Sequence, residues 1–174
     1  MKYVFQPLAI LSLAFTLAAC GSDSPISPSA GSTEKFTATL LPANEVPPIT
    51  SNEAGGSANA TITFNLSKDS AGYVTAASMD VSATAAGFPS GTALTRAHIH
   101  SGAAGTNGGI LVNVGLTDGE VRFASGGGSF TKAGIAVTVD QVNAILANPS
   151  GFYFNIHTAG SPDGVARGQL TRAQ

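Results

Sequence analysis

From residue 35 onward, short runs of alternating apolar and polar residues are separated by clusters of Gly, Pro, Ser and Asn. This pattern limits the possible folds more than any other feature of the chain. Residues 36–40 (FTATL) and 58–66 (ANATITFNL) alternate strictly, and a period of two places every second side chain on the same face of a strand. Similar runs occur at 73–83, 94–100, 110–114, 121–124, 152–157 and 165–171. About eight strands at this spacing predict an all-β domain, an antiparallel β-sandwich with Greek-key-like connections.

One segment has a helical rather than an alternating pattern. Within residues 138–146, apolar side chains recur at Val139, Val142, Ile145 and Leu146, which is the spacing of one helix face. Asp140 falls in the first turn, and the following Asn-Pro pair would end the helix. The sequence therefore predicts one short helix just before the strand at 152–157.

Charged residues are scarce and are not clustered. They make up 10% of the chain, with a net charge of −2, against roughly 25% in an ordinary soluble domain. No two basic residues are adjacent. Binding to a nucleic acid requires grouped Lys and Arg side chains that displace counterions from phosphates. Nucleic-acid binding is therefore not expected.

The N-terminal segment has the pattern of a signal peptide. An apolar stretch at residues 8–19 follows Lys2 and ends in small residues. It is shorter than the ~20 residues that a membrane-spanning helix needs. Cys20, the single cysteine, follows Leu17-Ala18-Ala19 directly, and this tetrapeptide resembles the lipobox of bacterial lipoproteins. The resemblance implies cleavage before Cys20 and a lipid-anchored chain; the alternative is an ordinary signal peptide followed by a free thiol.

These features predict three parts of the chain: a signal peptide at 1–19, a lipidated cysteine with a Gly/Ser/Pro tether at 20–34, and one domain at 35–172. The expected location is the cell envelope, facing the periplasm or the exterior. Gly21, rather than Asp, follows the cysteine. By resemblance to Gram-negative sorting rules, this favours the outer membrane.

All three histidines of the chain fall in strand-like segments. His98 and His100 are two residues apart and share a face, while Ala97 and Ile99 point the other way, as core residues do. The predicted strands at 152–157 and 165–171 also have one polar side each. If these strands lie nearby, His157 joins the same face. Imidazole is a ligand for copper and zinc, and three of them leave coordination positions open. The alternative is that these rings are solvated or hydrogen-bonded to turns. The same predicted face carries a set of polar residues that are candidates for anion binding: Arg96, Asn155, Arg167 and Gln169.

Other motifs have structural interpretations. Pairing of Arg96 or Arg167 with Asp163 is favoured over anion binding. Residues 44–48 (NEVPP) indicate a rigid edge segment, because proline cannot donate to a β-ladder. The Gly-rich residues 102–109 lack the lysine and helix of a phosphate loop and indicate a flexible loop. No catalytic triad, carboxylate pair or nucleophile elbow is found, so the sequence favours a non-catalytic role.

Four segments, in order, resemble the CHRD domain, a module named after chordin and common in secreted bacterial proteins. They are Asn44–Pro48, Ala97–Gly102, Asn155–Thr158 and Gly164–Leu170, and the resemblance extends from Phe36 to Thr171. It departs from the family pattern at Val165, where many members have Glu. In chordin the module belongs to an extracellular growth-factor antagonist. The resemblance therefore implies a membrane-anchored module that binds a protein or polysaccharide. The alternative is a copper- or zinc-binding protein that uses the three histidines, with redox activity in the case of copper.

Overall fold

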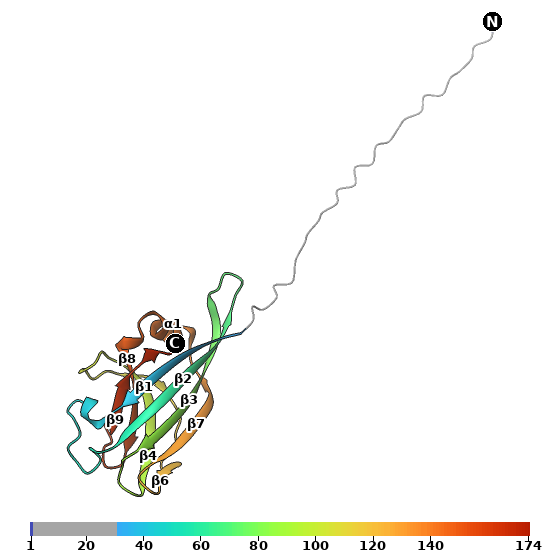
Figure 1. Ribbon diagram of the computed structural model, residues 1–174. Helices are drawn as coiled ribbons and strands as arrows, with labels where there is room; N and C mark the ends of the chain where they lie inside the picture. Colours follow the sequence, from blue (N-terminus) through green and yellow to red (C-terminus); the bar gives the residue numbers. More distant parts are fainter. Residues whose placement is uncertain (2–30) are drawn as a thin grey trace.

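Two five-stranded antiparallel sheets pack face to face (Figure 1). A computed structural model of the chain describes Met1 and residues 31–174. The first sheet has the order β10-β1-β2-β3-β7, and the second has the order β5-β4-β8-β9 with β6 also paired to β4. The strands of the first sheet are β1 (Ser32–Leu40), β2 (Ser57–Lys68), β3 (Val74–Ala86), β7 (Gly128–Ala136) and β10 (Thr171–Arg172). Those of the second are β4 (Thr92–Ser101), β5 (Ile110–Asn113), β6 (Val121–Phe123), β8 (Phe152–Thr158) and β9 (Ala166–Gln169). The predicted β-sandwich is confirmed.

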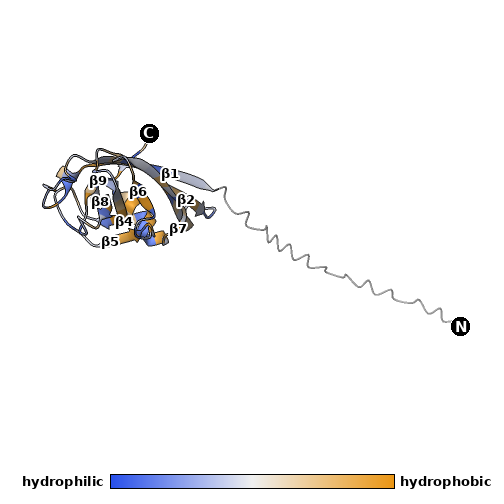
Figure 2. Cartoon of the chain, turned by 90° about the horizontal axis from the view of Figure 1, so that it is seen from below, coloured by the Kyte–Doolittle hydropathy of each residue, from blue (hydrophilic) through white to orange (hydrophobic). Residues whose placement is uncertain are grey.

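The hydrophobic core lies between the sheets and follows the alternation of the sequence. β1 and β2 pair in register over the whole length of β1, from Ser32 opposite Leu66 to Leu40 opposite Ala58. Their apolar positions are buried and most of the intervening polar ones are exposed. The second sheet supplies the other half of the core, with the fully buried residues Leu94, Ala97, Ile99, Phe154 and Ile156. Figure 2 shows hydrophobic residues, in orange, on strands of this second sheet.

The predicted helix is confirmed as α1 (Val139–Ala147). Thr138 begins it with a capping box: its hydroxyl accepts from the Gln141 amide at 3.2 Å, and the Gln141 side chain accepts from the Thr138 amide at 2.8 Å. Val142 and Ile145 are buried against the core. Two single-turn 3-10 helices, η1 (Pro42–Asn44) and η2 (Pro149–Gly151), complete the secondary structure.

The strands differ from the predicted ones in three places. β7 has no predicted counterpart, because its Gly- and Ala-containing sequence lacks strict alternation and its pairing with β3 forms the strand. The single strand predicted at 165–171 is divided at Leu170, where the chain leaves the second sheet and joins the first as β10. β1 begins at Ser32, inside the segment that composition assigned to the tether, because Ser32 pairs with Leu66.

The predicted signal peptide, Cys20 and the tether up to residue 30 lie outside the described residues, apart from Met1. No helix in the part of the chain that the structure describes is long and apolar enough to span a membrane.

Candidate metal centre

The three histidines lie on β4 and β8, neighbouring antiparallel strands of the second sheet. In their register His157 is opposite Arg96, and His98 is opposite Asn155. His98 and His100 share the face that points away from the core, while Ala97 and Ile99 are fully buried on the core side. The strand alternation therefore brings the histidines together, as the sequence predicted.

This outer face is not open to solvent. The exposed fractions of His98, His100 and His157 are 3%, 8% and 4%, and those of Asn155 and Arg167 are both 2%. Three connections cover the face: residues 41–56, residues 102–109 and the turn at 159–164. Of the predicted polar set, only Arg96 is exposed, and Gln169 is half-buried.

The imidazole rings converge on a small volume. His98 Nδ1 lies 3.0 Å from His157 Nε2, and one ring nitrogen from each of the three histidines lies within 4.8 Å of the other two. The ring centroids are 4.8 Å apart for His98 and His157, and 5.4 Å apart for His98 and His100. Sequence spacing placed these rings on one face, and the register of β4 with β8 brings their nitrogens close.

Backbone carbonyls determine which nitrogen of two rings carries the proton. His100 Nδ1 lies 3.0 Å from the Gly108 carbonyl, and His157 Nδ1 lies 3.0 Å from the Pro162 carbonyl. A carbonyl only accepts, so both Nδ1 atoms donate and both Nε2 atoms carry a lone pair in the neutral ring. His157 Nε2 accepts from His98 Nδ1, whereas His100 Nε2 is buried without a partner. Histidine ligands of metals typically donate their second ring N–H to a carbonyl in this way.

Burial favours the neutral form of all three rings. Burial first, and then the neighbouring His157, His100 and Arg96, together lower the pKa of His98 to about 4. Burial also lowers the pKa of His100 and of His157, against the opposing effect of their carbonyl hydrogen bonds. Metal binding requires deprotonated imidazole, which is the form that this environment favours near neutral pH.

The geometry suits a transition-metal ion. Two nitrogens bound at about 2.0–2.1 Å to one ion are about 3.3 Å apart at a tetrahedral angle. His98 Nδ1 and His157 Nε2 lie 3.0 Å apart, close to that value, and both could be ligands once His98 carries its proton on Nε2 instead of Nδ1. A ring nitrogen of His100 lies within 4.8 Å of the other two ligand atoms. The buried Nε2 of His100 has no hydrogen-bond partner among the described residues, and such an ion would give it one. Three imidazoles leave at least one coordination position for water or another ligand.

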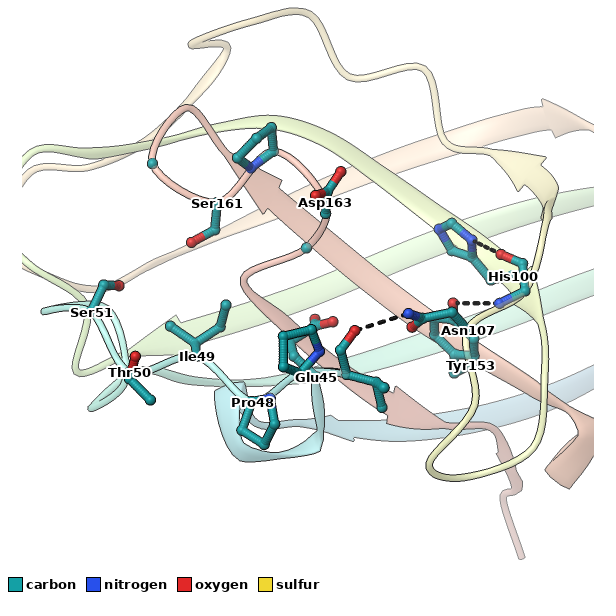
Figure 3. A pocket seen from close by; sticks show the side chains of 16 residues that line it. Glu45, Pro48, Ile49, Thr50, Ser51, His100, Asn107, Tyr153, Ser161 and Asp163 are labelled. Carbon is teal, nitrogen blue, oxygen red and sulfur yellow. Dashed lines mark hydrogen bonds between the residues drawn. The ribbon is translucent and has the colours of Figure 1, made fainter.

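A cavity of about 660 Å³ adjoins the histidines. The segment 45–51 and the turn at 160–164 form its walls, and His100, Asn107 and Tyr153 lie at one end (Figure 3). Asn107 Nδ2 donates to the Val46 carbonyl at 2.9 Å and joins two of the covering loops. His100 stacks on Tyr153 with the ring planes 3° apart. A small molecule in this cavity would contact His100, the one histidine of the three that lines it.

Arg167 fastens the covering loops instead of pairing with Asp163. Its Nε donates to the Asn44 carbonyl at 2.7 Å, and its Nη1 donates to the Thr106 carbonyl and Asn107 Oδ1. Its carboxylate neighbour is Glu45, with 3.7 Å between Nε and Oε2. The guanidinium also stacks 4.6 Å from the Tyr153 ring centroid.

The expected pair of Arg167 with Asp163 is thus wrong, because residues 41–45 lie closer to the guanidinium. Residues 102–109, expected to be a flexible loop, are held in place by the same contacts.

Sequence reasoning overlooked two buried acids, Glu45 and Glu53. Burial raises the pKa of Glu45 to about 7, against the lowering effect of Arg167. Glu45 belongs to the segment interpreted as a rigid edge, and Glu53 is in the connection that follows it. The sequence offered one signal: acidic residues are scarce, with only 10 in the chain, so each of them is a candidate for a specific role.

The pH dependence of stability follows from these shifts. In a metal-free Glu45→Gln variant, stability should fall by about 3 kcal/mol as pH drops from about 6.5 to about 4, from His98 alone. The reason is that the unfolded chain protonates His98 in this range and the folded chain does not. In the wild type, Glu45 opposes this loss, because its raised pKa makes the folded state bind a proton between about 7 and 4.5.

Denaturant unfolding at pH 4–7.5, with a chelator present, measures both profiles. The wild-type profile should be the flatter of the two. A Glu45→Gln profile no steeper than that of the wild type would contradict the assignment of these two groups.

Comparison with known proteins identifies the domain. The family model of the CHRD domain matches residues 36–170, nearly the extent predicted from the four motifs. No curated protein and no solved structure matches the chain significantly. The matched residues run from the middle of β1 to just beyond β9 and include all three histidines, Glu45 and Arg167. Because the match spans well over half of its length, the chain belongs to the CHRD domain family.

Proposed function

We propose that this CHRD domain binds one Cu²⁺ or Zn²⁺ ion through His98, His100 and His157. The observation that carries the proposal is the convergence of three buried, neutral imidazoles within 4.8 Å, two of them oriented by backbone carbonyls. A buried polar atom without a partner is costly, and an ion at this point removes that cost for His100 Nε2.

The ligand set favours copper and zinc over harder cations. Mg²⁺ and Ca²⁺ take oxygen ligands, whereas imidazole suits Cu²⁺ and Zn²⁺. When bound, zinc would supply Lewis-acid chemistry and copper would also supply one-electron redox chemistry. The chain's own residues would orient the ligand nitrogens and exclude bulk water from the ion. A ligand could reach the His100 side of the site from the cavity.

The lipid anchor remains part of the proposal. The segment Leu17–Cys20 supports acylation of Cys20, which would hold the domain at the cell envelope and, in a Gram-negative cell, at the outer membrane.

Binding of a protein or polysaccharide is a second candidate function. It is supported by the cavity, whose walls combine apolar side chains such as Pro48 and Ile49 with polar ones such as Asn107 and Asp163. A segment of a partner would reach the centre through this cavity.

Metal titration tests the main proposal. The purified chain, stripped with a chelator and then dialysed, should take up one equivalent of Cu²⁺ or Zn²⁺, measured by calorimetry and by elemental analysis after desalting. Mg²⁺ serves as the control ion and should not bind. Failure of both Cu²⁺ and Zn²⁺ to remain with the desalted protein would reject the proposal.

A further inference from the structure

Glu53 holds the turn that follows β8, more than a hundred residues further along the chain. Its Oε1 accepts from Thr158 Oγ1 at 2.8 Å, and its Oε2 accepts from Ser161 Oγ at 2.7 Å. The exposed fractions of Glu53, Thr158 and Ser161 are 8%, 2% and 7%. Charge-assisted hydrogen bonds this short are strong. Each carboxylate oxygen is therefore occupied by a hydroxyl of the same turn.

The turn itself orients one of the candidate ligands. The Ser161 amide donates to Thr158 Oγ1 at 3.0 Å, and the Thr158 amide donates to the Ser161 carbonyl at 3.3 Å. Pro162 follows directly, and its carbonyl accepts from His157 Nδ1 at 3.0 Å. Pro162 has no amide proton of its own, so Ser161 and the bonds on either side set the position of this carbonyl.

These contacts form one continuous path from the carboxylate to the ring. Glu53 accepts hydrogen bonds from Thr158 and Ser161 and so fixes the turn that carries the Pro162 carbonyl. That carbonyl accepts from His157 Nδ1 and keeps the proton on that nitrogen. His157 Nε2 is thereby left as a lone pair that points at His98. Removing the carboxylate would leave two buried hydroxyls without acceptors and would free the turn to move.

We propose that Glu53 is a positioning residue of the metal centre, which sets the tautomer and direction of His157 through the turn at 158–162. Glu53 is not a ligand, because the converging group consists of histidines alone. Its effect on metal affinity rests on the proposed function above, whereas its effect on the His157 ring does not. Changes to such outer partners typically weaken metal binding about 10- to 100-fold.

The test compares Glu53→Ala and Glu53→Gln with the wild-type full chain. Imidazole ¹⁵N shifts of His157 in the metal-free protein report which nitrogen carries the proton, and titration with Zn²⁺ reports affinity. In the wild type His157 should carry its proton on Nδ1. In Glu53→Ala it should become a mixture of tautomers, and affinity should fall about 10- to 100-fold. Glu53→Gln, whose amide can still accept from Thr158 and donate to Ser161, should recover most of both.

Asp80→Ala is the matched control. Asp80 also accepts two hydrogen bonds, from Asn65 at 2.9 Å and from the Gly134 amide at 2.8 Å, but it lies in the first sheet. The Asp80→Ala substitution should lower stability without changing the His157 tautomer or the Zn²⁺ affinity. If Glu53→Ala does not fold, Ser161→Ala removes one of the two bonds and should give an intermediate change in both readouts.

The outcomes separate the two proposals. If the wild type binds no Zn²⁺, the proposed function fails, and the ¹⁵N shifts still decide the role of Glu53. If the wild type binds Zn²⁺ but Glu53→Ala, or Ser161→Ala in its place, keeps the wild-type tautomer and affinity, the inference about Glu53 is overturned.

Discussion

Replacing His157 with alanine is expected to abolish most of the rise in melting temperature that Cu²⁺ or Zn²⁺ produces in the wild-type domain. A ligand that binds only the folded state stabilises it by about 2.7 kcal/mol at a hundredfold excess over its dissociation constant. In a domain of this size, each kcal/mol raises the melting temperature by about 2–4 °C. The wild type should therefore gain roughly 5–10 °C, and a chelator should reverse the gain.

The geometry explains why one histidine is enough to remove the effect. His157 Nε2 lies 3.0 Å from His98 Nδ1, and the ring is held by the Pro162 carbonyl. Without it, two imidazoles remain and the ion loses a third of its protein ligands. His100→Ala should act in the same way, because His100 Nε2 is buried and has no hydrogen-bond partner among the residues that the structure describes.

Differential scanning fluorimetry with and without metal measures these shifts, so that changes in metal-free stability cancel. Tyr73→Ala removes an aromatic ring that is 73% exposed on the β2–β3 hairpin and should leave the metal-induced shift intact. Identical responses from the wild type and His157→Ala would show that the three histidines do not form one site.

Cys20→Ser should transfer the protein completely from the membrane fraction to the soluble fraction. The sulfur is the atom that would carry the diacylglycerol, and serine cannot form the thioether. Several acyl chains together anchor a protein stably, and a protein that lacks them loses this attachment. The expected change is therefore all or nothing.

Fractionation and mass spectrometry of the mature N-terminus measure the result. Ser22→Ala, two residues beyond Cys20, is the control and should remain lipidated. A wild-type protein that begins at another residue, or that begins at Cys20 without acyl chains, would refute the lipoprotein assignment.

Local patterns in the sequence determined the strands and the faces of most of them. The alternation along residues 94–100 assigned Ala97 and Ile99 to the core, and both are fully buried. The same alternation placed His98 and His100 on the opposite face of β4. The spacing of Val142 and Ile145, with Asp140 in the first turn, located the helix. These features depend on the geometry of a few successive residues, which is why they can be derived without a tertiary structure.

Only the tertiary structure decided that the histidine face is buried. Its cover comes from irregular segments whose sequences have no period, and whose positions depend on partners far along the chain. Arg167 joins Asn44 to Thr106, and Glu53 holds the turn around Ser161. β7 and the division of the last strand at Leu170 likewise depend on pairing between distant segments. Alternation assigns a residue to a face, but whether that face meets water depends on what folds over it. That coverage lowers the pKa of the histidines and converts a polar strand face into a candidate metal centre.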